Sequence, residues 1–182
     1  DRPAARLRDY VQAVQACWRA FNREERLSHD GEFYQMSLLP RDWSPKAHDH
    51  PMKVDISAVG PYMCKVAGEL CDGVHVHPMH SMTYINTRLL PDLQSGADRS
   101  GRSASDIDLI IPVFAIPGDS AEERQSMINR TRMQISFYGS TPNYSFQFDD
   151  LGYDGTTQKL GALMKQGDIP AMANLISDEM LE

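Results

Sequence analysis

The chain has 182 residues and a formal net charge of -7, with 41% apolar and 24% charged residues. This length suffices for one domain with a sizeable core, and the negative charge argues against a nucleic-acid partner, which would require clustered Lys and Arg. No apolar run approaches the roughly 18 residues of a membrane-spanning helix, and no signal peptide is visible. We therefore expect a cytoplasmic protein without a membrane partner.

A long amphipathic helix is predicted at the beginning of the chain. Asp1 is a candidate helix cap, Pro3 suits a first helical turn, and apolar residues recur at helical spacing over residues 7–21. Residues 22–52 have no regular period. We expect an irregular loop there, with a short strand or hairpin within residues 33–39.

The next segment has the pattern of two strands joined by a helix. Residues 54–59 alternate between apolar and polar, as a strand does, and Gly60-Pro61 suits the beginning of a helix. We expect that helix to end at Gly73, with the glycine in the left-handed conformation, and residues 73–78 to form a second strand. Strands joined by so short a crossover helix are expected to be parallel, with a right-handed connection.

A further helix and a third strand are predicted after this βαβ unit. Ser81 is a candidate cap for the helix, which Pro91 should kink because its ring clashes with the preceding turn. Residues 108–116 are apolar from Leu109 onward, as expected of a strand that is buried on both faces. Pro112 within this run is unfavourable in a central strand.

The remainder of the chain is predicted to be mainly helical. Ser120 and Glu123 have the spacing of a capping box, so we expect a helix to begin there and to end at Gly139. Residues 143–155 are rich in Tyr, Phe and Asp and predict a loop. Two helices are then expected, over about 156–166 and, capped by Asp168, about 169–182.

Several stretches of the chain are distinctive as motifs: AVGPYMCKVAGELCDGVHVHP at 58–78, RPAARLRDYVQAVQACW at 2–18, GEFY at 31–34, RMQISFYGSTPNY at 132–144 and DEML at 178–181. Together they resemble the luciferase-like monooxygenases, a superfamily of flavin- and deazaflavin-dependent oxidoreductases built on a TIM barrel. The FYGSTP motif resembles the subgroup that uses coenzyme F420. The resemblance extends over most of the chain.

The resemblance implies an α/β fold, namely a partial TIM (β/α)8 barrel made of the middle-to-late βα units, with parallel strands near 54–59, 73–78 and 108–116. Because such a barrel takes about 250 residues, we expect residues 1–182 to be a single partial domain that lacks the first half and the last strand. Residues 22–52 would be an irregular loop or hairpin, and residues 139–182 a helical insertion. The unpaired strand edges should make the isolated chain self-associate.

The turn between the first predicted strand and its helix is a candidate anion site. Ligands bind parallel sheets at the carboxyl ends of strands, and there the backbone N–H groups of Gly60, Tyr62 and Met63 favour an anion. A helix start in which glycine serves only the turn is the alternative. The resemblance implies that the cofactor phosphate lies near this turn and the next, with the candidate cofactor-binding residues Ala58, Val59, Gly60, Pro61, His77 and His80.

Residues around the GSTP motif are candidates for a substrate pocket, because aromatic and amide groups suit an apolar substrate with one polar handle. These residues are Arg132, Gln134, Tyr138 and Tyr144. Tyr138 and Tyr144 are the candidate substrate-binding residues, and solvent-facing positions are the alternative. The sequence shows no nucleophile–base pair, so the catalytic residues stay unknown.

The histidines of the second strand allow another interpretation. His75 and His77 would share one face of the strand, with His80 as a third ligand, as in metal-dependent TIM-barrel hydrolases. Zinc or iron would need neutral imidazoles and further ligands, and Asp55 is not obviously level with the histidines. A structural role for His75 is a further alternative, and we expect no metal.

The resemblance implies an F420- or FMN-dependent oxidoreductase or monooxygenase that acts on a small organic substrate, with coenzyme F420 as the cofactor and FMN as the alternative. Residues near the cofactor ring are expected outside this chain, which alone should be inactive. Two alternatives from other classes stay open: a metal-dependent TIM-barrel hydrolase and a non-catalytic barrel-derived binding domain. The substrate and the oligomeric state, for which a homodimer is one candidate, stay open too.

Overall fold

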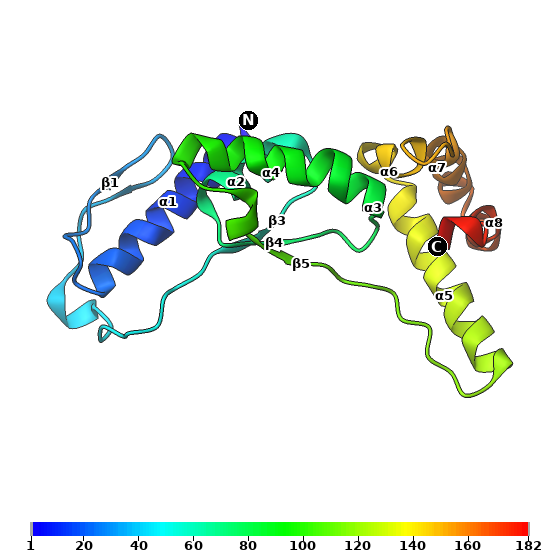
Figure 1. Ribbon diagram of the computed structural model, residues 1–182, viewed down its shortest axis with the longest axis horizontal. Coiled ribbons are helices and arrows are strands. Elements are labelled where there is room, and N and C mark those ends of the chain that lie inside the picture. Colours follow the sequence, from blue (N-terminus) through cyan, green and yellow to red (C-terminus); the bar gives the residue numbers. More distant parts are fainter. Residues whose placement is uncertain (1, 182) are drawn as a thin grey trace. The chain divides into compact units, whose positions relative to one another are not determined.

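The computed structural model describes residues 2–181, so the predicted cap Asp1 lies outside the described residues. The described residues form two compact units (Figure 1). Unit 1 comprises residues 2–76 and 88–110, and unit 2 comprises residues 77–87 and 111–181. Throughout residues 2–181, every helix is too short or too polar to cross a membrane.

A three-stranded parallel sheet lies at the centre of unit 1 (Figure 1). Its strands, in the order β3-β4-β5, are β3 (Asp55–Ser57), β4 (Gly73–His75) and β5 (Asp108–Ile110). Ile56, Val74 and Leu109 are in register across the sheet. Helix α2 (Pro61–Leu70) connects β3 to β4, so the predicted βαβ unit and its parallel pairing are confirmed. Both strands are shorter than the predicted ranges 54–59 and 73–78, and His77 lies beyond the end of β4.

The third strand is shorter than predicted. β5 ends at Ile110, and residues 111–118 form neither helix nor strand. Pro112 accounts for the difference, because a proline has no N–H to donate to a neighbouring strand. The prediction of a strand over residues 108–116 is therefore wrong beyond Ile110.

Gly73 does not have the role that the sequence suggested. Helix α2 ends at Leu70 and is followed by Cys71 in an extended conformation, with φ at -100°. Gly73 lies in strand β4, and a Cβ there would lie 2.5 Å from a carboxylate oxygen of Asp55. Gly73 therefore lies in a strand beside the Asp55 side chain and not in a left-handed turn.

Unit 1 also contains a long helix and a small hairpin. Helix α1 (Pro3–Phe21) is confirmed, and the irregular segment contains a small antiparallel hairpin of β1 (His29–Asp30) and β2 (Gln35–Met36), followed by a 3-10 turn at Arg41–Trp43. The hairpin is joined to α1 by the buried carboxylate of Asp9, which accepts hydrogen bonds from the N–H groups of Phe33 (2.5 Å) and Tyr34 (3.0 Å).

Helix α4 (Leu90–Ala97) packs closely against α2 in unit 1. A Cβ on Gly68 would lie 2.0 Å from the carbonyl oxygen of Leu93, and a Cβ on Gly96 would lie 2.1 Å from that of Lys65. Both neighbours are backbone atoms, so no side-chain rotation can make room. The adjoining segment Ile85–Leu89 is π-helical, a local irregularity that fits the absence of an N–H at Pro91.

Unit 2 is mainly helical. Its helices are α3 (Met82–Tyr84), α5 (Ala121–Gly139), α6 (Phe146–Asp149), α7 (Thr156–Gln166) and α8 (Ile169–Leu175), with 3-10 turns at Pro142–Tyr144 and Glu179–Leu181. The capping box of Ser120 and Glu123 and the cap at Ser81 are confirmed. The core of the unit is formed by Met79, Phe148, Leu160, Met172 and Ile176.

The last predicted helix is too long by several residues. α8 ends at Leu175, and Ile176 is extended, with ψ at 110°. Its side chain is 1% exposed and belongs to the core of unit 2. Because α8 ends at Leu175, the side chain of Ile176 can be buried in the core of unit 2. The prediction of one helix over residues 169–182 is therefore wrong beyond Leu175.

We expect Gly68→Ala to lower the free energy of unfolding by about 3 kcal/mol, because the added methyl group fits only if α2 and α4 move apart. Gly161→Ala is a matched control within α7, because its Cβ would lie 3.6 Å from the nearest other atom. This control should be stabilised by about 0.5–1 kcal/mol. Urea unfolding followed by circular dichroism measures both, and equal midpoints would contradict the packing described.

Candidate functional site

The turn after β3 combines an uncapped helix end with open space. Gly60 is the N-cap residue of α2, its backbone is extended, and no side chain caps this end of the helix. A Cβ at Gly60 would meet nothing within 4 Å. The first N–H groups of an α-helix have no partner within the helix, so the turn presents donors and the positive end of the helix dipole to an approaching anion.

The predicted site residues around this turn share its geometry. Ala58 is buried, Val59 and Gly60 are half-buried, and Pro61 is the first residue of α2. All of them belong to unit 1, whereas His77 and His80 belong to unit 2. The two groups are therefore described separately.

His77 and His80 are connected by hydrogen bonds in unit 2. The Nδ1 atom of His77 accepts a hydrogen bond from the N–H of Met79 at 3.1 Å. The Nδ1 atom of His80 lies 2.9 Å from the carbonyl oxygen of His77, which can only accept, so it is the donor there. A neutral His77 thus carries its proton on Nε2, and a neutral His80 has an acceptor at Nε2.

Two predicted substrate residues contact His77. The ring of Tyr138, on α5, lies 4.8 Å from the imidazole in an edge-to-face arrangement, and that of Tyr144 lies 4.6 Å away. Burial lowers the pKa of His77, and the neighbouring His80 lowers it further. The structure therefore brings together three residues that the sequence assigned to two different sites.

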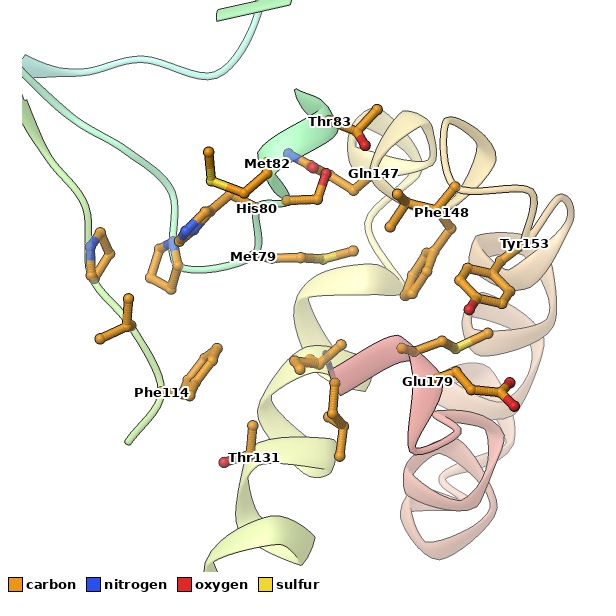
Figure 2. A pocket seen from close by; sticks show the side chains of 18 of the residues that line it. Met79, His80, Met82, Thr83, Phe114, Thr131, Gln147, Phe148, Tyr153 and Glu179 are labelled. Carbon is orange, nitrogen blue, oxygen red and sulfur yellow. The ribbon is translucent and has the colours of Figure 1, made fainter. Parts of the chain in front are cut away.

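A cavity of about 540 Å³ opens within unit 2 (Figure 2). Its walls are mainly apolar, and they include Met79, Phe114, Ile135, Phe148, Tyr153 and Met180. The polar side chains include His80, Thr83, Gln147 and Glu179. Of the predicted cofactor and substrate residues, all of which lie in the described part of the chain, only His80 lines this cavity.

Gln147 is the most unusual residue of the cavity. It is 4% exposed, and neither its Nε2 nor its Oε1 atom has a hydrogen-bond partner in the described structure. Leaving a buried amide unpaired costs roughly 1–3 kcal/mol for each group. The sequence analysis missed this residue, because a glutamine in a polar and aromatic loop carries no sign of burial.

Two other residues near the GSTP motif have ordinary roles. Arg132 forms an ion pair with Asp178, and Gln134 is exposed on α5.

His75 is exposed at the end of β4, with its Nε2 atom 3.8 Å from the carboxylate of Asp55 in unit 1. Among residues 2–181, no three His, Cys, Asp or Glu side chains are grouped as metal ligands, so nothing supports the hydrolase alternative.

Comparison with known proteins identifies the family. The family described as luciferase-like monooxygenase matches residues 1–182. The chain belongs to the luciferase-like monooxygenase family. An uncharacterized protein of Mycobacterium bovis is 37% identical over 180 residues, which make up 98% of this chain and 53% of that protein. The chain thus spans about half the length of this curated relative.

More distant similarities point to F420-dependent members. An F420-dependent glucose-6-phosphate dehydrogenase of Kribbella flavida is 31% identical over 112 residues, covering 60% of this chain and 30% of that enzyme. The solved structure of the coenzyme F420-dependent tetrahydromethanopterin reductase of Methanopyrus kandleri superposes with a TM-score of 0.68 at 18% identity. It covers 96% of this chain and 49% of the reductase, and it shows a common fold.

The environment of His77 can be tested by NMR. We expect its pKa to lie below about 6.5 and to rise toward that value in Tyr144→Ala, because loss of the ring lets water reach the imidazole. Tyr62→Ala is the control, since Tyr62 is 76% exposed on α2 in unit 1. An unchanged pKa of His77 in Tyr144→Ala would show that the Tyr144 ring does not shield it.

Proposed function

We propose that the protein is an F420-dependent oxidoreductase that acts on a small organic substrate, with FMN as the alternative cofactor. Membership of the luciferase-like monooxygenase family and the similarity to an F420-dependent dehydrogenase support this. The observation that carries it is the uncapped, unobstructed turn at Gly60 on the carboxyl side of a parallel strand. Such a turn suits the phosphate tail of the cofactor.

We also propose that the chain forms middle-to-late βα units of a (β/α)8 barrel, within a single partial domain. The parallel order β3-β4-β5 and the similarity to the reductase fold support this arrangement. In it, the loops that follow the strands would border the active site. Residues 139–181 would be the helical insertion expected from the sequence.

The residues present fit a phosphate-bearing cofactor. In unit 1, Ala58, Val59, Gly60 and Pro61 form the turn that would meet the phosphate, and the donors would be the N–H groups of Gly60, Tyr62 and Met63. In unit 2, His77 and His80 stay proposed cofactor-binding residues, and a neutral His77 would offer a donor at Nε2. When bound, F420 supplies a ring that accepts or donates a hydride. We assign Tyr138 and Tyr144 to the substrate side of His77, where they limit its access to water.

The sugar phosphate in the name of the dehydrogenase is not carried over to this protein. No Lys or Arg lines the cavity of unit 2 in the described structure, and phosphate groups are usually held by such residues. The substrate class is therefore better argued from the cavity itself.

We expect Gly60→Asp to weaken F420 binding about a hundredfold, and to weaken it more than Gly60→Asn, whose side chain can occupy the same backbone donors without adding a charge. Asp and Asn have the same shape and both are favourable N-cap residues, so both variants should fold. They differ in charge, and one charge pair near 4 Å costs about 1 kcal/mol in water and about 4 kcal/mol at a partly buried site. Fluorescence titration of the purified protein with F420 and, separately, with FMN measures both variants.

The same titrations name the native cofactor and can refute the assignment. Tighter binding of FMN than of F420 by the unmodified protein would select the alternative cofactor. Tight binding of F420 by a folded Gly60→Asp variant, equal to that of Gly60→Asn, would show that the phosphate lies elsewhere. Binding of neither cofactor would contradict the proposed function.

A further inference from the structure

We propose that the cavity of unit 2 binds a small, neutral, mainly apolar molecule whose polar edge carries a hydrogen-bond acceptor next to a donor, as a carboxamide or a lactam does, and that Gln147 recognises this edge. The identification of this molecule as the substrate rests on the proposed function. The binding of such a polar edge by the cavity is independent of the proposed function.

The position of Gln147 is fixed by its neighbours. Phe148 is buried in the core, and Phe146 contacts Tyr84 with ring centroids 5.5 Å apart. Gly139 lets α6 approach α5, because a Cβ there would lie 2.5 Å from the Phe148 ring. Gln147 therefore has little freedom to swing its amide into solvent.

The amide of Gln147 is directed at the cavity wall that is formed by residues 78–83. Figure 2 shows Gln147 extending from α6 toward the segment of His80 and Thr83, while the ring of Phe148 points away from that segment. A buried amide with no partner is rare in native proteins and calls for an explanation. A ligand that supplies both an acceptor and a donor would satisfy Nε2 and Oε1 together.

The surroundings favour a neutral ligand. The lining residues include no Lys or Arg within the described chain, and Glu179 is the carboxylate among them. An anionic ligand would have no countercharge and would meet Glu179. The Nε2 atom of His80 and the hydroxyl of Thr83 offer further polar contacts along the cavity wall, and the remaining wall is largely apolar. A volume of about 540 Å³ is typical of small-molecule sites.

Three probes of nearly equal shape test the proposal. Benzamide has the acceptor and the donor, acetophenone has only the acceptor, and isopropylbenzene has neither. We expect benzamide to bind the purified, cofactor-free protein about tenfold more tightly than isopropylbenzene, with acetophenone between them, because an unmatched buried amide penalises the analogue. Ligand-observed NMR gives the three dissociation constants. Equal affinities, or no binding of any probe, would overturn the proposal.

Gln147→Met separates recognition from shape. This variant keeps the length of the side chain but removes the amide, so we expect benzamide to lose its advantage and to bind no more tightly than isopropylbenzene, because its own amide would then be buried without a partner. Gln158→Met is the control, because Gln158 is exposed on α7, and it should keep the ranking of the unmodified protein. Retention of the ranking in Gln147→Met would refute the role of the amide.

Thermal unfolding gives a second readout that a structural role would not produce. Without ligand, Gln147→Met should raise Tm by about 2–4 °C, because it removes an unsatisfied buried group. A lower Tm would indicate that the amide stabilises the fold through a partner of its own, which contradicts the proposal. The ranking of the probes on the unmodified protein still holds as a test if this variant does not fold.

Titration with F420 distinguishes the two proposals. If F420 does not bind but the ranking of the probes holds, the cavity and Gln147 keep their assignment and the proposed function fails. If F420 binds and the probes show no ranking, the proposed function stands and this inference is overturned.

Discussion

The pairing of β4 with a parallel strand on each side is the constraint on which the rest of unit 1 depends. Val74 is fully buried, and it is in register with Ile56 on one side and Leu109 on the other. For β3 and β4 to be parallel neighbours, α2 must return the chain alongside the sheet. The turn at Gly60 is thereby placed at the carboxyl end of β3, where a helix N-terminus can meet an anion.

The packing of α2 alongside the sheet also restricts which residues can occupy certain positions. The close contact of α2 with α4 requires glycine at 68 and 96, because a Cβ at either position would meet backbone atoms of the other helix. These positions serve close packing, whereas Gly60 borders open space. The glycines of this segment are therefore explained in different ways. Packing explains Gly68 and Gly96, whereas no packing contact explains Gly60, whose open surroundings leave room for a ligand.

The periodic parts of the fold could be predicted from sequence, because period and turn chemistry agree there. Residues 54–78 gave the βαβ unit, and Ser120 with Glu123 gave the beginning of α5. Contacts between distant segments could not be predicted. Gly73 was assigned to the end of the helix, although its pairing with β3 places it in strand β4. The sequence also did not show that β5 would end before Pro112.

Some residues of the candidate site could be predicted from the sequence, whereas others could be found only in the structure. The helix start and the family resemblance pointed to Gly60, the resemblance pointed to His77, and the aromatic residues around the GSTP motif pointed to Tyr138 and Tyr144. The structure adds that the two tyrosines contact the histidine. Gln147 has no motif and is distinguished only by burial without a partner. An amide left unsatisfied reduces stability, and proteins commonly accept such a cost where a ligand must be recognised.

The central claim is that the backbone at Gly60 receives the phosphate of F420. Amide chemical shifts of the isotopically labelled protein, recorded during titration with F420, test it most directly. We predict that the largest changes occur at the N–H groups of Gly60, Tyr62 and Met63, because a phosphate accepting from them changes their environment most. Saturable binding of F420 that leaves these three amides unmoved, while others shift, would contradict the account.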